Sequence, residues 1–543
     1  MMSLPTLNFI NHQDLNSTFD GAIILFTDKN ALVDLMPSTK KWIELDADFG
    51  NSVQLLLPED GVPSQRVIIS PTGSLHNDFD DVRRYKDAAF AAGQRALKAG
   101  FTSPVIYFAD TPTSTEQQGL HWSFNHSDDY EEYLSVTVLG FLEATFEPID
   151  ARAHYDKIQQ PAPTFSSLNI VPSYQIKDQD EFANKIVAIE AGRRIAVDIG
   201  SPDPEMMSPE NIVRYIQEHF QEDSSCIQIK VIENIETIKK EYPLAHAVTR
   251  ASLAVPRHHP RFVTFEYKSP DQSKVKENLY FVGKGVTYDT GGADIKCSGN
   301  MRGMSRDKCG AAAVAGFFKT IEHLKPLHVN VTAGIALVRN SVGPDMYVSD
   351  EVIYSRNGTR VLVGNTDAEG RMVMTDLLCE FKERVLSEAS SKPSFLFTVA
   401  TLTGHAIRAY NGYGIVMDNG FARKHKISQR IYDAGHIMAD PFEISTFRRE
   451  DVACVQPGRS SEDIVQANDK PSTMTNRGHQ YPAGFMLIAS GLDKHGINTE
   501  SPIGYTHVDI AGSAELMSAI GWSLPRVTGS PVAAFTDAFL TRQ

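Results

Sequence analysis

The chain has 543 residues, a formal net charge of −15, 42% hydrophobic and 22% charged residues, which is the composition of an ordinary globular protein. At roughly 150 residues per domain, this length predicts two to four domains, each large enough to bury a core without a disulfide or a structural metal. The acidic excess disfavours broad contact with nucleic acid or anionic membrane surfaces, because both repel a negatively charged protein.

The cysteines, the first residues and the lengths of the apolar runs indicate the cellular compartment of the protein. Five cysteines stand at irregular spacing without a C-x-x-C pair, which is typical of a reducing compartment rather than of a disulfide framework. The first 20 residues lack the basic and apolar segments of a signal peptide, and no apolar run approaches the roughly 20 residues that span a bilayer. We therefore expect a cytoplasmic protein without a membrane partner.

The amino-terminal part of the chain alternates strands with helices. The apolar runs Ala22–Phe26 and Val105–Phe108 predict strands, and Asp81–Ala99 predicts a helix. Prolines between residues 161 and 172 indicate a linker, and Asp178–Ile195 has the apolar spacing of a helix. The α/β alternation resumes after this helix and continues to the end of the chain.

Polar clusters follow four apolar segments that we expect to be strands: Leu279–Val282, Val331–Val338, Val361–Val363 and Phe395–Ala400. The clusters are Gly283-Lys284-Gly285, Arg339-Asn340-Ser341, Gly364–Asp367 and Thr401–Gly404. In α/β sheets, ligands bind beyond the carboxyl ends of the strands. The four clusters therefore predict one shared crevice.

Two glycine-rich segments, 283–307 and 365–371, concentrate charged residues. Singly, Asp307 and Asp367 could each be the N-cap of the helix expected after it, at Cys309–Phe318 and Met372–Lys382. Together, carboxylates that meet at strand ends repel one another by roughly 4 kcal/mol per pair at about 4 Å and an effective dielectric constant near 20, so they need cations. Two divalent ions would supply that charge and activate a water, and oxygen ligands leave Mg, Mn and Zn open.

Other motifs are weaker. The Asp-Thr-Gly triplet at Asp289 resembles an aspartic protease loop, but those enzymes need a second such triplet, which this sequence lacks. A phosphate-binding P-loop is absent as well. His507 could be a metal ligand or a buried histidine with satisfied hydrogen bonds, and the buried interpretation is favoured. His258 and His259, beside Pro260, suggest a surface loop.

The charged segments resemble the signature of the leucyl aminopeptidase family of dinuclear metallo-exopeptidases. The family's lysine, aspartate, lysine and aspartate are matched by Lys284, Asp289, Lys296 and Asp307, and its N-T-D-A-E-G-R motif is complete from Asn365 to Arg371. The likeness continues through Thr401–Gly404 to His507–Gly512. It implies a smaller α/β domain at residues 1–172, a linker helix at 173–199, and a catalytic α/β domain at 200–543 with a central mixed sheet flanked by helices.

The resemblance also implies a role for each matched residue. Lys284, Asp289, Asp307 and Glu369 would hold one metal ion, and Asp289, Asp367 and Glu369 would hold the other. Lys284 would bind as the neutral amine. Lys296 would stabilise the developing oxyanion, and Arg371 would hold a bicarbonate that accepts the proton of the bridging water. Five residues would surround the substrate: Met304, Thr401, Leu402, Gly404 and Ala511.

The activity that the resemblance implies is removal of the first residue from peptides with a free amino terminus, by two divalent ions (Zn, Mn or Mg), in a homohexamer. A dinuclear phosphoesterase stays an alternative, because the same metal chemistry suits a phosphoryl oxygen, and so does a non-catalytic assembly or nucleic-acid-binding member of the family. Lys308, His405 and the stretch Phe442–Gly484 depart from the family pattern. We expect these departures to change the pocket or the subunit contacts rather than the metal ligands.

Overall fold

A computed structural model divides the chain into two compact units: unit 1 contains residues 1–190 and 436–439, and unit 2 contains residues 191–435 and 440–543. The structure describes residues 4–11, 19–58, 64–75, 77, 79–112, 129–160, 162–201, 203–221, 225–388, 390–457, 459–468, 470, 474–516 and 523–542. Each unit has its own β-sheet and its own buried apolar core.

Unit 1 is built on a six-stranded sheet in the order β1-β6-β5-β2-β4-β3. Its strands are β1 (Thr6–Phe9), β2 (Ala22–Phe26), β3 (Gln54–Leu56), β4 (Val67–Pro71), β5 (Val105–Phe108) and β6 (Ser167–Ile170). All neighbours pair in parallel except β3 and β4. Every residue of β2 is buried, as expected for a central parallel strand covered on both faces.

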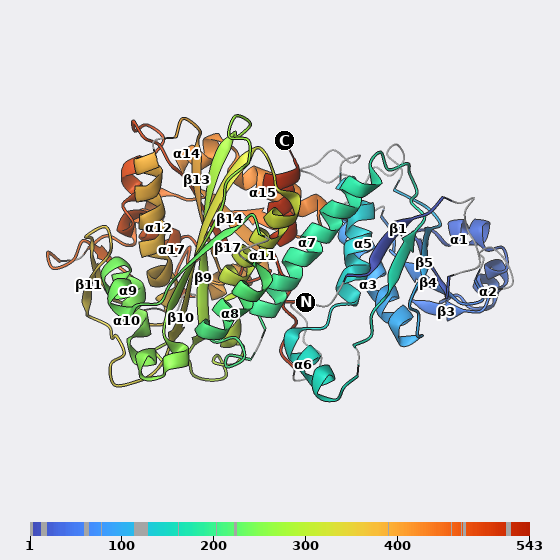
Figure 1. Ribbon diagram of the computed structural model, residues 1–543, viewed down its shortest axis with the longest axis horizontal. Coiled ribbons are helices and arrows are strands. Elements are labelled where there is room, and N and C mark those ends of the chain that lie inside the picture. Colours follow the sequence, from blue (N-terminus) through green and yellow to red (C-terminus); the bar gives the residue numbers. More distant parts are fainter. Residues whose placement is uncertain are drawn as a thin grey trace. The chain divides into compact units, whose positions relative to one another are not determined.

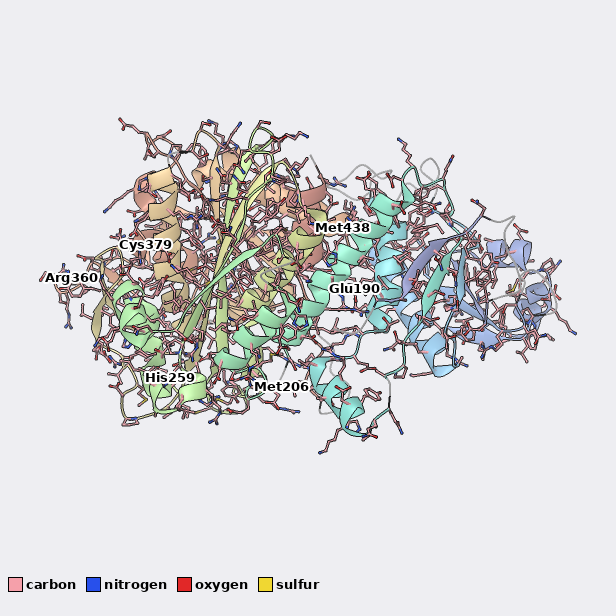
Figure 2. All side chains as sticks on the ribbon, in the orientation of Figure 1. Glu190, Met206, His259, Arg360, Cys379 and Met438 are labelled. Atoms are coloured by element: carbon pink, nitrogen blue, oxygen red, sulfur yellow. The ribbon has the colours of Figure 1, made fainter. Side chains whose placement is uncertain are left out.

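The helices of unit 1 lie between these strands in the chain. They are α1 (Lys29–Leu35), α2 (Thr39–Leu45), α3 (Arg83–Lys98), α5 (Tyr133–Ala144) and α6 (Ile149–Lys157). The strands expected at Ala22–Phe26 and Val105–Phe108 are confirmed, and the expected helix is α3. The helix expected at Asp178–Ile195 is α7 (Gln179–Ile199), and the boundary between the two units falls inside it, after Glu190, which Figure 2 labels.

Unit 2 is built on an eight-stranded mixed sheet in the order β15-β14-β17-β13-β9-β10-β8-β7. Its strands are β7 (Gln228–Ile232), β8 (Arg261–Tyr267), β9 (Glu277–Asp289), β10 (Val329–Asn340), β13 (Ser394–Ala400), β14 (Gly414–Asp418), β15 (Phe442–Ile444) and β17 (Gly504–Asp509). The four central strands, β17, β13, β9 and β10, run in parallel. Their carboxyl ends therefore meet at one edge of the sheet.

Helices cover both faces of this sheet. Helices α12 (Glu369–Glu388) and α17 (Tyr481–Ala489) lie on one side of it and α11 (Cys309–Leu324) lies on the other (Figure 1). The remaining helices after α7 are α8 (Pro209–His219), α9 (Ile235–Glu241), α10 (Pro243–Thr249), α13 (Gly404–Tyr410), α14 (Gly420–Lys424), α15 (Ile427–Ile437), α16 (Arg449–Ala453) and α18 (Val532–Thr536). The predicted fold class, a mixed sheet flanked by helices, is confirmed. Among the described residues, no helix combines the length and apolar character needed to cross a bilayer.

Unit 2 also contains a separate three-stranded sheet, whose central strand precedes the polar loop Gly364–Asp367. Strand β12 (Arg360–Leu362) pairs antiparallel with β11 (Val352–Tyr354) and parallel with β16 (Ile464–Val465). The strand expected at Val361–Val363 therefore lies outside the main sheet. The polar cluster Gly364–Asp367 comes from this smaller sheet, whereas the clusters after β10 and β13 come from the main one.

Candidate metal centre

Strand β9 carries the first two predicted ligands. The sequence pattern placed the end of this strand at Val282, but β9 continues to Asp289, so Lys284 lies inside it. The glycines on either side of Lys284 allow close packing. A β-carbon on Gly283 would lie 2.8 Å from the Cα of Ala311 in helix α11, and one on Gly285 would lie 2.5 Å from a carbonyl oxygen of β10. The strand is thus both extended and tightly enclosed at this point.

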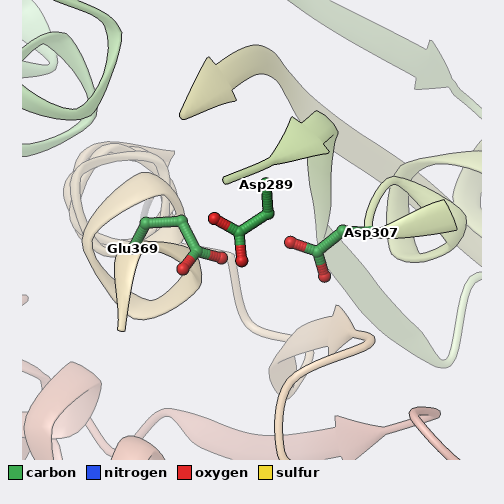
Figure 3. A group of neighbouring side chains, drawn as sticks. All are labelled: Asp289, Asp307 and Glu369. Atoms are coloured by element: carbon green, nitrogen blue, oxygen red, sulfur yellow. The ribbon is translucent and has the colours of Figure 1, made fainter. Parts of the chain in front are cut away.

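Three carboxylates converge just beyond β9. Asp289 ends the strand, Asp307 precedes α11, and Glu369 is the first residue of α12. Each offers a carboxylate oxygen that lies within 4.8 Å of those of the other two, and Figure 3 shows the three groups pointing toward one another. The capping interpretation of Asp307 is wrong, because the N-cap of α11 is Lys308 and no side chain caps this helix.

Two lysines join these carboxylates into one cluster. Lys284 Nζ lies 2.7 Å from Asp307 Oδ1 and 2.9 Å from Glu369 Oε1. Lys296 Nζ lies 2.9 Å from Asp289 Oδ2 and also pairs with Asp367. A β-carbon at position 370 would lie 2.7 Å from Lys284 Nζ, so the glycine of the N-T-D-A-E-G-R motif is needed to admit the lysine.

Burial and mutual repulsion shape the acidity of the carboxylates. Burial, with the charge of Glu369, raises the pKa of Asp289 and of Asp307 despite the neighbouring lysines. Burial and the charge of Asp289 raise the pKa of Asp367 to about 7. Burial also opposes ionisation of Glu369, but Lys284 and Lys296 outweigh it, and its pKa is lowered. Of these four carboxylates, Glu369 is thus the one whose pKa lies below its ordinary value.

The cluster fits divalent cations. Its four carboxylates and two ammonium groups have a formal net charge of −2. Two like charges about 4 Å apart in such a site repel each other by roughly 4 kcal/mol. Asp307 Oδ2 and Glu369 Oε2 are buried and have no hydrogen-bond partner in the described part of the chain. Buried oxygens of this kind need a partner. Carboxylate oxygens are suitable ligands for Mg, Mn or Zn.

The pKa of Lys284 depends on the same charges. Burial by itself would lower the pKa of its ammonium group, but Asp307, Glu369 and Asp289 outweigh burial and raise the pKa. A dication on these carboxylates would offset their charge and let burial dominate. This is the condition under which the lysine can be a neutral amine ligand.

Arg371 lies two residues after Glu369 on α12 and is buried. Its Nη1 donates a hydrogen bond to the carbonyl oxygen of Gln466 at 2.8 Å, and its guanidinium lies 5.3 Å from the ring centre of Tyr481. Burial lowers its pKa to about 10, so it remains a cation at neutral pH. Its Nε is buried and has no hydrogen-bond partner among the residues that the structure describes. Arg371 therefore keeps one donor for an anion.

The predicted substrate residues line one cavity with the metal centre. The cavity has a volume of about 980 Å³, and its walls include Met304, Thr401, Leu402, Gly404 and Ala511. Asp509, at the end of β17, holds two of these segments together. Its Oδ1 accepts from the backbone N–H groups of Leu402, at 3.2 Å, and Ala511, at 3.1 Å. All five residues that the resemblance assigned to the substrate thus border the same space.

The burial predicted for His507 is confirmed, whereas the prediction for His258 is wrong. His507 is fully buried, with Nδ1 2.8 Å from Thr398 Oγ1, and burial lowers its pKa to about 3. It belongs to the core, although its Nε2 has no partner among the described residues. The surface position expected for His258 is wrong, because it is 7% exposed and lies 2.9 Å from Glu205 Oε1. Its neighbour His259, labelled in Figure 2, is half-buried.

Sequence reasoning missed Gln466, which follows β16. This residue is fully buried, and its side-chain oxygen accepts from the backbone N–H of Gly364, at 2.9 Å, and of Asn365, at 3.0 Å. Its Nε2 donates to the carbonyl oxygens of Asn365, at 2.8 Å, and Ala368, at 2.9 Å. Its side-chain amide thus holds the backbone of the motif loop, while its carbonyl accepts from Arg371. No sequence signal marks it.

Three further residues hold Thr366 in the centre of that loop. Asn340 Nδ2 and Tyr347 Oη donate to the carbonyl oxygen of Thr366 at 3.1 and 2.7 Å, and Asp294 Oδ2 accepts from its N–H at 2.7 Å. Asn340 also donates to Asp289 at 2.8 Å. The polar cluster after β10 had marked Asn340, whereas Tyr347 carries no such signal. The four clusters do meet at one site.

The departures from the family pattern have different positions. Lys308 is fully buried, its Nζ donates to the carbonyl oxygens of Ser201, at 2.8 Å, and Ser305, and burial lowers its pKa to about 8. His405 Nδ1 lies 3.0 Å from Nδ1 of His479, which belongs to the stretch Phe442–Gly484. The same stretch contributes Asn468, Thr475, Gly478 and Tyr481 to the cavity wall. Gly458, Asp469 and residues 471–473 of this stretch lie outside the described residues.

Comparison with known proteins gives a consistent result. The catalytic domain of the cytosol aminopeptidase family matches residues 194–536. A Caenorhabditis elegans protein named as an aminopeptidase is 37% identical over 498 residues, which cover 91% of this chain and 90% of that protein. A protein of Persephonella marina named as a cytosol aminopeptidase is 29% identical over 384 residues, or 69% of each chain.

Two solved structures share the fold. Leucyl aminopeptidase from Trypanosoma cruzi superimposes with a TM-score of 0.76 at 20% identity, over 100% of this chain and 98% of its own. The bottromycin maturation enzyme BotP in complex with Mn superimposes with a TM-score of 0.73 at 18% identity, over 96% of this chain and 99% of its own.

Proposed function

The chain belongs to the cytosol aminopeptidase family, and from that premise we propose that it is a two-metal exopeptidase that removes the first residue of peptides with a free amino terminus. The observation that carries the proposal is the buried cluster of Lys284, Asp289, Asp307 and Glu369, which joins Asp367 through Lys296. The same cluster would suit a phosphoesterase, but family membership favours peptide hydrolysis.

Each residue of the cluster has a defined task in this proposal. Held by Lys284 and the four carboxylates, two divalent ions (Zn, Mn or Mg) would lower the pKa of a shared water and polarise the scissile carbonyl. The neighbouring carboxylates raise the pKa of Lys296 despite its burial, so its ammonium group stays charged. It can therefore turn from Asp289 and Asp367 toward an oxyanion that develops beside them.

Arg371 and the substrate loops complete the site. Arg371 lines the cavity, and its Nε, which no described residue contacts by a hydrogen bond, suits a small anion such as bicarbonate, which would accept the proton of the attacking water. Leu402 and Ala511, which Asp509 holds together, would contact the first side chain of the substrate. The free amino group of the substrate would bind a metal ion at the acidic end of the cavity, which would make the enzyme an exopeptidase.

The direct test is hydrolysis by the full chain after loading with Zn, Mn or Mg. We expect release of free amino acids from dipeptides and amino-acid amides, loss of that activity on chelation, and no cleavage of matched N-acetylated substrates. Metal analysis should find two divalent ions per chain. Chelator-sensitive release of phosphate without release of amino acids would contradict the proposal and support a phosphoesterase.

The location and assembly of the protein belong to the same proposal. The name of the Persephonella marina relative, a cytosol aminopeptidase, supports a cytoplasmic location. The family resemblance supports a homohexamer, a dimer of trimers. Light scattering in solution should give six times the chain mass of 60.0 kDa, and a monomeric mass would contradict the hexamer without bearing on the metal centre.

A further inference from the structure

An ion pair spans the cavity wall that would receive the first side chain of the substrate. Arg306 lies between the predicted substrate residue Met304 and the candidate ligand Asp307, and Glu515 lies four residues after Ala511. Arg306 Nη1 lies 2.8 Å from Glu515 Oε2, and its Nη2 donates to the carbonyl oxygen of Pro525. This one guanidinium therefore ties together the two segments that carry Met304 and Ala511.

The two partners of this ion pair differ in accessibility. Both line the cavity, but the side chain of Arg306 is 4% exposed whereas that of Glu515 is 29% exposed. Both Nη groups of Arg306 are engaged, and its Nε is fully buried. Arg306 contacts Oε2 of Glu515, and no hydrogen bond from a described residue occupies Oε1, which can therefore accept from a ligand. The more accessible partner of this ion pair is therefore the carboxylate of Glu515.

The surroundings of Glu515 suit a long side chain with a charged end. Leu516, Leu524 and Ile407 line the same cavity and offer apolar surface. Lysine and arginine combine an apolar stem with a cationic head, so they can pack the stem on such a surface while the head reaches an acceptor. A leucine side chain would instead cover the carboxylate without a hydrogen bond, which is unfavourable.

We infer that Glu515 is a specificity residue that selects peptides whose first residue has a cationic side chain, lysine or arginine. The inference rests on the proposed aminopeptidase function, because it places the first side chain between Met304 and Ala511. Arg306 is the positioning residue, since it holds the carboxylate in the wall and is itself shielded from the substrate. A charge-assisted hydrogen bond from the substrate to Oε1 supplies the selectivity.

Substrate preference gives the first test. The metal-loaded full chain is assayed with the fluorogenic amides of lysine, arginine, leucine and glutamate. We expect kcat/KM for the lysine and arginine amides to exceed that for the leucine amide. Values for the leucine amide that equal or exceed both would overturn the inference while leaving the proposed aminopeptidase intact. Absence of hydrolysis of all four amides would instead contradict the proposed function.

The variant Glu515→Gln removes the charge but keeps the shape and an acceptor for Arg306. We expect the ratio of kcat/KM for lysine amide to that for leucine amide to fall at least ~10-fold, the range of a charge-assisted hydrogen bond. An unchanged ratio, or an equal loss for both substrates, would show a purely structural role and overturn the inference. The matched control is Glu351→Gln, because Glu351 is 28% exposed, pairs with Arg250 at 2.7 Å and lies outside the cavity wall.

Direct binding gives a readout that needs neither turnover nor a variant. Lysine and norleucine have the same stem and differ in the terminal ammonium group. Calorimetry with the metal-loaded protein should show at least ~10-fold tighter binding of lysine than of norleucine. Equal affinities, or tighter binding of norleucine, would overturn the inference even if the protein hydrolysed no substrate.

Discussion

The motif segment Asn365–Arg371 and the stretch Phe442–Gly484 contribute to one site in different ways. The motif segment supplies the side chains of Asp367, Glu369 and Arg371 to the candidate centre. The described residues of the second stretch supply no candidate metal ligand, but its Gln466 makes three side-chain hydrogen bonds to the backbone of the first and a fourth to the preceding Gly364. One region carries chemical groups, and the other determines where those groups lie.

This difference predicts different consequences of substitution. A side chain that holds a metal ion cannot be replaced without losing the ion, because the charge and the ligand atom disappear together. A side chain that holds a loop can be lost while the ligands remain, although their positions relax. Substitutions of the carboxylates in the motif segment should therefore lower metal content, whereas those in the second stretch should lower turnover with the metal retained.

The largest effect is expected for Glu369→Gln and Asp367→Asn. Each removes a carboxylate from the centre, and loss of metal activation removes several kcal/mol of transition-state stabilisation, so kcat/KM should fall at least ~10³-fold with loss of bound metal. Kinetics and metal analysis on the same samples measure both. The control is Glu383→Gln in the same helix, where the side chain is 45% exposed and pairs with Arg356. Full activity of either ligand variant would disprove the ligand assignment.

Arg371→Ala should have the next largest effect. Removing the cation that we propose holds the proton-accepting anion should lower kcat about 10²-fold, the lower end of the range for general-base catalysis. Metal content should change much less, because Arg371 is not among the proposed ligands. The comparison of kcat with metal stoichiometry decides between these roles. A parallel loss of metal and activity would show that Arg371 acts only by maintaining the centre.

Gln466→Met should show the effect of the second region alone. Methionine matches the length of glutamine but makes none of its four hydrogen bonds to the loop, each worth about 1 kcal/mol. We expect kcat to fall about 10-fold with two metal ions retained, because a displaced ligand loop weakens alignment. Gln456→Met, an exposed change in the same stretch, is the control. Loss of metal as complete as in Glu369→Gln would erase the distinction between the two regions.

The smallest effect is a change in thermal stability with pH. The folded-state pKa of Asp367 is raised to about 7 from an ordinary value of 3.8, so its stabilising contribution is complete below the ordinary value and is lost as pH rises through about 7. Raised pKa values of Asp289 and Asp307 act in the same direction. Metal-free protein should therefore lose thermal stability as pH rises from about 4 to about 7.

Metal-loaded protein should lose less thermal stability over the same pH range, because divalent ions bind the ionised carboxylates. The difference in Tm between loaded and chelated protein should thus widen as pH rises across this interval, as measured by differential scanning fluorimetry. If the difference in Tm narrowed instead, the two lysines alone would be sufficient to balance the negative charge of the carboxylates.

Prediction from sequence succeeded where local pattern and chemistry coincide. Strands Ala22–Phe26 and Val105–Phe108 have the predicted bounds, because continuous apolar runs of this length are buried strands in almost any α/β context. It failed at the end of β9, where glycines that resemble a turn instead allow a neighbouring helix to pack closely. It also failed for His258, whose burial depends on distant Glu205 and Arg339.

The sequence by itself determined the class of chemistry and the family. The spacing of Lys284, Asp289, Lys296 and Asp307 and the complete motif from Asn365 to Arg371 are properties of side-chain identity, which a sequence records directly. Only the tertiary structure decided the roles of Gln466 and of the pair Arg306 and Glu515. Their partners lie about 100 and 209 residues away along the chain, and neither local propensity nor spacing carries information about contacts that the fold brings together across such distances.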